Sequence, residues 1–140
     1  MATLDIQPLV MLDVICNISL APTGGDDFSK HLDAVTLTPT ASAITWTGLG
    51  KNTFSATQTA TWSAVLNYAQ DWESAVDESL SRFLFDNEGV TLYIEFRPMR
   101  GAGTTWTIEA TASPGAIGGT VGAVATASVT LGCTKPVPSV

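Results

Sequence analysis

Apolar and polar residues alternate along most of this chain, and this period of two constrains the possible folds more than any other feature. Between residues 59 and 70, Thr, Ser, Val and Asn alternate with four apolar residues: Trp62, Ala64, Leu66 and Tyr68. Such alternation is typical of a half-buried β-strand, because successive side chains point to opposite faces. Similar patterns fall in residues 12–20, 35–38, 44–47, 90–97, 106–110 and 125–131. The sequence therefore predicts a mainly β protein.

Glycine, proline and aspartate gather in the segments that separate these strands. Residues 21–33, APTGGDDFSKHLD, are predicted to form a loop, and residues 47–55 the tip of a hairpin. A second hairpin turn is predicted over 96–104, and a larger glycine-rich excursion over 113–122. Pro39 is expected to end a strand or to mark an edge strand, since proline lacks the N–H that a central strand donates.

Residues 71–89, DWESAVDESLSRFLFDNEG, break this rhythm and contain 6 of the 13 acidic residues. Four apolar residues at i, i+4, i+7 and i+8 form one stripe of an α-helix: Val76, Leu80, Phe83 and Leu84. We expect a helix over about 73–87 that packs this stripe on the sheets. Its acids are expected to form a solvated face or, alternatively, a contact with a neighbouring subunit or a surface that repels phosphate.

The ends of this helix carry signals of their own. Asp71 is the predicted N-cap, and Gly89 suits the C′ position because glycine readily adopts a left-handed conformation. Arg82 follows Glu78 by four residues, so a weak ion pair is expected between them. The adjacent acids Asp77 and Glu78 point in different directions on a helix, so they cannot act as a matched acid and base.

Composition indicates the size and compartment of the protein. With 140 residues and 45% hydrophobic content, the chain is expected to form a single domain, residues 1–140, with a substantial core. No apolar run approaches the ~20 residues of a membrane helix, and the N-terminus lacks a signal-peptide pattern. We therefore expect a protein made and kept in a cytoplasm, with Cys16 and Cys133 as free thiols.

Charged residues are scarce, at 14% of the chain against about 25% in ordinary soluble domains. This scarcity fits either a low-charge β protein or a subunit whose surface is largely covered in an assembly. The net charge is −7, and the six basic residues are scattered without forming a patch. Because affinity for nucleic acid comes mainly from Lys and Arg, we expect no conventional DNA binding.

The residue types that carry catalysis or bind metals do not form a recognisable motif. His31 is the one histidine, and its neighbours Asp26, Asp27 and Asp33 match neither an EF-hand nor a zinc spacing. The glycines of residues 113–122 precede no GKT or GKS sequence, so no phosphate-binding loop is predicted. We expect no catalytic residue, no cofactor and no metal. An enzyme built on the residue 26–33 segment would need metal-dependent activity that His31→Ala removes.

One block of the chain, ATWSAVLNYAQDWESAVDESLSRFLFDNEGVTLYIEFRP, resembles the major tail protein, or tail tube protein, of long-tailed phages that infect actinobacteria. The turn at Tyr68–Trp72 leading into Ser79–Leu84 is the most specific part of the likeness. The similarity covers roughly residues 59–134, whereas the N-terminal half fits only in its general pattern. Cys133 and the terminal KPVPSV depart from the family pattern.

This resemblance implies two packed antiparallel β-sheets, arranged as a sandwich or barrel and flanked by one α-helix. It also implies hexameric rings that stack into a hollow tube around a tape-measure protein, with a tail terminator and distal tail proteins as further partners. Genomic DNA would pass through the channel without specific binding, and no membrane partner is implied. The protein would then belong to the virion tail, after assembly in the host cytoplasm.

Several surfaces are candidates for contacts in such an assembly. The loops at 21–33, 47–57 and 97–104 could bridge stacked rings or could be plain exposed connections. Among the tryptophans, the expected packing anchors are Trp62, Trp72 and Trp106. An alternative function is a monomeric β-sandwich binding module, such as a capsid decoration protein or a carbohydrate-binding domain. Exposed aromatics would favour it, with Trp46 as the best platform candidate, although we expect Trp46 in the core.

Overall fold

The computed structural model describes residues 1–22, 24–74, 78–99 and 103–139, and it confirms a mainly β fold. One α-helix is present among these residues, α1 (Leu80–Asp86). The strands are β1 (Ile15–Ser19), β2 (Asp26–Asp27), β3 (Leu32–Thr40), β4 (Ala43–Thr47), β5 (Thr53–Thr57), β6 (Thr61–Ala69), β7 (Thr91–Arg97), β8 (Thr105–Thr111), β9 (Thr126–Cys133) and β10 (Val137–Ser139).

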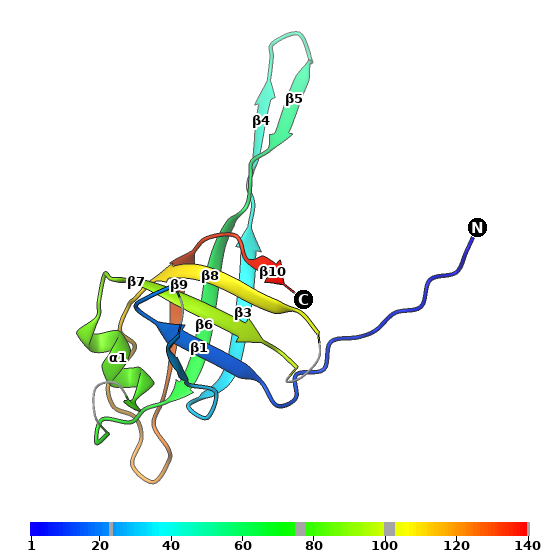
Figure 1. The fold of residues 1–140 in the computed structure, drawn as a ribbon. Coiled ribbons are helices and arrows are strands. Elements are labelled where there is room, and N and C mark those ends of the chain that lie inside the picture. Colours follow the sequence, from blue (N-terminus) through cyan, green and yellow to red (C-terminus); the bar gives the residue numbers. More distant parts are fainter. Residues whose placement is uncertain (23, 75–77, 100–102, 140) are drawn as a thin grey trace.

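The body of the molecule is an antiparallel sheet that folds over into two packed layers. Its strand order is β2-β1-β7-β8-β9-β6-β3, with β10 added to β8. One layer contains β1, β7 and β8, and the other contains β9, β6 and β3, whose strands run across the first (Figure 1). The layers are joined where β8 meets β9, through a single ladder pair between Ala110 and Cys133. The predicted pair of packed antiparallel layers is confirmed, but they are continuous at this corner.

Alternate residues of these strands fill the space between the layers. Leu66 on β6, Ile94 on β7 and Ile108 on β8 are at most 1% exposed. Val129 and Leu131 of β9 meet Leu66 and Ala64 of β6 as direct ladder partners. Burial of such apolar faces is the main force that stabilises a two-layer fold. The inward faces predicted from alternation for β6, β7, β8 and β9 are therefore confirmed.

The helix is shorter than predicted, because it begins at Leu80 and ends at Asp86 instead of spanning 73–87. Ser79 is its N-cap and accepts from the backbone N–H of Arg82, so Asp71 is not the cap. Asp71 instead accepts hydrogen bonds from the backbone N–H groups of Glu73 and Ser74. These bonds hold a turn before the helix, as aspartate commonly does.

The rest of the helix prediction has a mixed outcome. Leu80, Phe83 and Leu84 are buried as expected, whereas Val76 and Asp77 lie outside the described residues. Arg82 pairs with Asp86 at 2.9 Å rather than with Glu78, because Glu78 precedes the N-cap and is not on the helix surface. The C-cap is Asn87, and the left-handed residue that follows is Gly89, with φ of 81°.

The glycine-rich excursion between β8 and β9 is tied back to the body at two places. Gly115 approaches β6 and β9 so closely that a Cβ there would lie 2.3 Å from the Tyr68 hydroxyl and 3.0 Å from Val129. The Gln70 amide donates to the Gly118 carbonyl, and its oxygen accepts from the Gly118 N–H, both at 2.9 Å. Glycine therefore serves close backbone approach here, as predicted.

Two segments leave the body. Within the described part of the chain, strands β4 and β5 pair only with each other, and they form a hairpin that extends away from the two layers (Figure 1). We call residues 43–57 the arm. The N-terminal residues 1–11 also run outward as an extended, exposed segment (Figure 1). The predicted hairpin tip at 47–55 is confirmed by the pairing of Thr47 with Thr53.

Candidate assembly surfaces

The acidic segment around His31, residues 26–33, stabilises the loop between β1 and β3 through hydrogen bonds to Asp27. A carboxylate oxygen of Asp27 accepts from the backbone N–H groups of Cys16, at 3.2 Å, and Ser29, at 3.0 Å. The His31 ring lies edge-on to Phe28, with 5.7 Å between centroids. Within the described residues, no three His, Cys, Asp or Glu side chains are grouped so that they could hold a metal ion. The prediction that residues 21–33 form a loop is only partly right, because in the structure this range contains β2 and the first two residues of β3.

Both cysteines are free thiols, as predicted from the sequence. Cys16 lies in the core, where burial and, to a smaller extent, the Asp27 carboxylate raise its pKa to about 12. Burial also raises the pKa of the Cys133 thiol. A thiol is a nucleophile only as the thiolate, so the core position makes Cys16 chemically inert in the folded protein.

The arm has one apolar and one polar face. Trp46 pairs directly with Phe54 across the two strands, and Ile44 pairs with Ala56, which places these four side chains on one face. The intervening Thr and Ser residues form the other face. Trp46 is 59% exposed and Phe54 is 60% exposed. The expectation that Trp46 lies in the core is wrong, because alternation predicts a two-faced strand without showing whether the same chain covers the apolar face.

The arm is joined to the body by a hydrogen-bonded neck. The Gln58 N–H donates to the Ser42 carbonyl at 2.9 Å, and the Ser42 hydroxyl donates to the Gln58 side chain at 2.9 Å. The Thr61 hydroxyl donates to the Thr40 carbonyl at 3.3 Å, just inside the body. The arm therefore continues the β3–β6 pair outward as one ribbon, with its direction set by those two strands.

A second uncovered apolar surface lies between the layers. It is a groove of about 580 Å³ with lining residues from several strands and from the N-terminal segment, among them Leu9, Val35, Leu37, Trp62, Phe96, Trp106 and Lys135. Trp62 and Trp106 are half-buried, so these two predicted packing anchors also form the wall of an open surface. We call this surface the interlayer groove.

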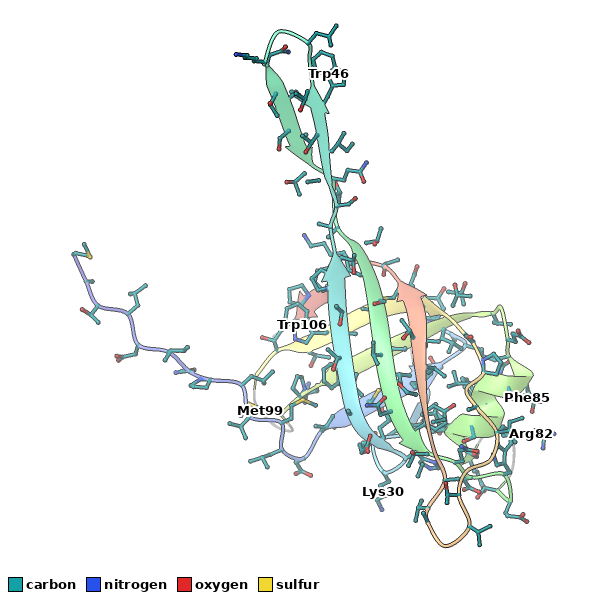
Figure 2. The ribbon with its side chains drawn as sticks, turned by 180° about the vertical axis from the view of Figure 1, so that it is seen from behind. Lys30, Trp46, Arg82, Phe85, Met99 and Trp106 are labelled. Atoms are coloured by element: carbon teal, nitrogen blue, oxygen red, sulfur yellow. The ribbon has the colours of Figure 1, made fainter. Side chains whose placement is uncertain are left out.

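The third predicted anchor, Trp72, lies at the helix end of the body. Its ring meets Phe85 edge-on, with 6.0 Å between centroids, and its indole N–H donates to Gln70 at 3.1 Å. Phe85 is itself 47% exposed. Figure 2 shows Phe85 and Arg82 on the helix, at the opposite end of the molecule from Trp46 on the arm. Trp72 thus packs at the surface rather than in the core.

Charge is distributed unevenly between these two ends. The described residues of 71–89 include five acids: Asp71, Glu73, Glu78, Asp86 and Glu88. Hydrogen bonds from Ser74 and Glu73 lower the pKa of the exposed Asp71 carboxyl, so it stays ionised. The arm has one charged residue, Lys51. Subtracting this +1 from the chain's net −7 leaves −8 for all other residues.

The sheet of the body has open ends. β3 is the last strand in the hydrogen-bonded order of the described residues, and at the other end β2 pairs with only Asn17 and Ile18 of β1. Pro39 lies within β3, which agrees with its predicted place on an edge strand. Exposed strand edges invite pairing with another chain.

No helix in the part of the chain that the structure describes is long and apolar enough to cross a membrane.

Comparison with known proteins gives a likeness of fold. No protein-family model matches the chain, and no curated protein matches its sequence. Among solved structures, the chain is similar to the sheath/tube terminator of the extracellular contractile injection system PVC, determined by electron cryo-microscopy in its extended state. The TM-score is 0.57 at 14% identity, and the match covers 96% of this chain and 99% of the terminator chain.

Proposed function

We propose that this protein is a structural subunit of a phage-type tail tube, which assembles into stacked hexameric rings that form a channel for genome delivery. The observation that carries the proposal is the match of nearly the whole chain to the fold of a sheath/tube terminator. The tail-tube resemblance of residues 59–134 supports the same class of role. These two lines are independent, because one rests on backbone geometry and the other on residue patterns.

The physical features of the chain suit such a subunit. Open sheet edges at β3 and β2 can be completed by neighbouring copies, and a closed ring removes edges altogether. A net charge of −7 suits a wall past which DNA must slide, since like charge prevents adhesion to phosphates. Screening confines this effect to about 8–10 Å at physiological salt, so the residues lining the channel decide it.

A second candidate function is a terminator that closes the end of a tube with a single ring. The specific observation that favours it is that the protein with the similar fold is itself a sheath/tube terminator. A tube subunit needs complementary upper and lower faces that stack without limit, whereas a terminator ring stops after one layer. Assembly of the purified protein therefore separates the two roles.

The monomeric binding module is the competing proposal from a different class, and the exposed Trp46 and Phe54 are its best support. Electron microscopy of the concentrated protein tests all three. Hollow tubes support the tube subunit, and single rings that do not stack support the terminator. A particle that remains monomeric at every concentration, and that is not incorporated when preformed tail tubes are supplied, would contradict both tail roles.

A further inference from the structure

The N-terminal segment is attached to the body at its root and exposed toward its start. Leu12 forms a parallel β-bridge with Met99, which lies where the segment leaves the body (Figure 2). From this bridge toward the N-terminus, the exposed fraction rises from 43% at Met11 to 65% at Leu9 and 87% at Leu4. Figure 1 shows the segment running outward beyond the start of β1. Its apolar side chains thus become more exposed with distance from the bridge.

The root of this segment already lies along the interlayer groove. Leu9 and Met11 line the groove together with Val35 of β3. Pro8 lines an adjoining hollow of about 350 Å³, and Trp106 belongs to the walls of both. The segment therefore follows one rim of the groove, and the residues that precede Pro8 are tethered at that rim.

We propose that the N-terminal segment is a strap that closes over the interlayer groove of its own chain. A bend at Pro8 returns the preceding residues to the groove, where Leu4 and Ile6 pack against the two tryptophans of its wall. Leu4 and Ile6 are 87% and 83% exposed, and their spacing of two places them on one side of an extended chain. Proline is favoured at the second position of tight turns, which suits such a bend. The structure shows the open strap.

Tether length favours the chain's own segment over any other occupant of the groove. Leu4 precedes Leu9 by five residues, so it lies at most about 18 Å from a residue that already lines the groove. A tether this short gives an effective concentration on the order of millimolar, which separate copies at micromolar concentration do not match. The strap therefore competes well against a second molecule for this surface.

Charge complementarity favours the same occupant. Lys135 is the one charged side chain among the described residues that line the groove, and it is exposed. Asp5 is the one charged side chain of residues 1–11, and it lies between Leu4 and Ile6. When those two apolar side chains point into the groove, Asp5 points outward, where it can meet Lys135 at the rim. The two charges have opposite signs, so closure brings them together favourably.

Closure acts on assembly through β3, and this part of the inference rests on the proposed tail role. Val35, Thr36 and Leu37 of β3 line the groove, and β3 is the last strand in the hydrogen-bonded order of the described residues. A strap beside these residues hinders this edge from pairing with another copy. The cost of ordering a few residues is similar in size to the gain from burying two apolar side chains, so the open and closed states are close in free energy. The strap is therefore a brake that a neighbouring copy can displace.

The first test traps the closed strap in the full chain, at a dilution where the protein is monomeric. The trap variant is Ile6→Cys with Thr36→Cys, and the control is Ile6→Cys with Ser128→Cys, an exposed residue on the outer face of β9. Both carry Cys133→Ala, so the buried Cys16 is the one remaining native thiol. Under mild oxidation we expect the trap pair to form its disulfide at least about tenfold faster than the control pair. Non-reducing electrophoresis separates a disulfide within one chain from one between two chains.

Reversal of charge tests the predicted ion pair in the same background. Asp5→Lys should slow closure of the trap by up to about fivefold, the effect of losing an exposed ion pair. Addition of Lys135→Asp should restore the rate, because the opposite charges are then exchanged. Three results would overturn the inference: equal rates for trap and control, a disulfide that joins two chains, or a charge reversal that Lys135→Asp does not rescue.

A second test measures the brake by following assembly with light scattering and electron microscopy. We expect the oxidised trap variant to assemble at least about tenfold more slowly than the same protein after reduction. Leu4→Ser with Ile6→Ser should assemble faster than the wild type, whereas Thr3→Ser with Gln7→Ser, on the alternate positions, should match it.

Failure of this inference differs from failure of the tail role. If the trap closes within one chain, but neither the reduced variant nor the wild type forms rings or tubes, the strap stands and the tail role is wrong. If rings or tubes form and the trap does not close, or if oxidation leaves their rate of assembly unchanged, the brake is wrong and the tail role stands.

Discussion

The body and the arm are built from the same ribbon, yet they are stabilised differently. β3 and β6 continue outward into β4 and β5, and all four strands alternate apolar and polar residues. In the body, the apolar face of β6 is buried, with Ala64, Leu66 and Tyr68 at most 2% exposed. In the arm, every strand residue is exposed. Alternation thus specifies a two-faced ribbon, and only the neighbouring elements decide whether its apolar face is covered.

The largest expected difference between the two regions comes from matched phenylalanines. Phe83 on α1 is 7% exposed and packs against Phe28, with 5.7 Å between ring centroids, whereas Phe54 on the arm is 60% exposed. We expect Phe83→Ala to lower the free energy of unfolding by about 3–5 kcal/mol, because it leaves a cavity. Phe54→Ala should change it by less than about 0.5 kcal/mol.

Urea denaturation at a concentration where the protein is monomeric measures both values. Comparable losses for the two variants would mean that the arm folds back and is covered by its own body, contrary to the structure.

Glycines offer the next comparison. Gly115→Ala places a methyl group against the Tyr68 hydroxyl and Val129, so we expect it to cost about 1–3 kcal/mol by overpacking. At Gly50, on the arm tip, the nearest atom to an added Cβ is 3.8 Å away, and Gly50→Ala should be close to neutral. Melting temperatures of the two variants, with wild type alongside, give the answer. A neutral Gly115→Ala would show that the excursion is not held against β6.

A third comparison uses pH. The folded state holds the pKa of Cys16 near 12, against an ordinary 9.0, so the unfolded state loses this proton first as pH rises. The contribution of the protonated Cys16 thiol to the free energy of unfolding is therefore complete below pH 9. Above pH 9 this contribution falls by up to about 1.4 kcal/mol per pH unit. The difference in unfolding free energy between wild type and Cys16→Ala should shrink accordingly from pH 8 to pH 10.5.

A thiol placed on the arm serves as the control for this measurement. Ala56→Cys, in the Cys16→Ala background, lies on an exposed strand and should add no such slope. If the difference in unfolding free energy between wild type and Cys16→Ala does not change with pH, then solvent reaches Cys16 in the core.

The smallest expected effect concerns the helix N-terminus. Ser79→Ala removes the cap of α1 and should lower the unfolding free energy by about 1 kcal/mol, within a range of 0.5–2. Ser55→Ala, on the exposed polar face of the arm, should lower it by much less. Chemical denaturation resolves the difference, and equal effects at the two serines would argue that the helix starts elsewhere.

The strands and their inward faces could be predicted from the sequence, because burial of one strand face against a second layer requires apolar and polar residues to alternate. The sequence was insufficient for the start of the helix. The acids and serines of 71–79 favour helix by spacing, but Asp71 binds the N–H groups of the two residues at 73 and 74 and holds them in a turn. Competition between a side chain and the helix for the same N–H groups is not visible in periodicity.

The candidate site was predicted less well than the fold. The hairpin tip was expected, but the exposure of Trp46 was not, because a strand pattern carries no information on which elements lie nearby. The interlayer groove was also missed. Its lining residues come from β3, β6, β7, β8 and the N-terminal segment, which are distant from one another in sequence. The sequence predicted Trp62 and Trp106 only as packing anchors. Only the three-dimensional arrangement brings them to one opening.

The corner between β8 and β9 has a mechanical consequence. Among the described residues, the strands at this corner are joined by one ladder pair, Ala110 with Cys133, and by two hydrogen bonds. The Thr134 N–H donates to the Glu109 carbonyl, and the Glu109 N–H donates to the Thr134 hydroxyl. Because this connection is narrow, we expect the angle between the layers to depend on the bulk of the side chains packed between them. A larger or smaller residue between the layers is then expected to change the direction of the arm relative to β1, β7 and β8. The curvature of any array of copies would change with that direction.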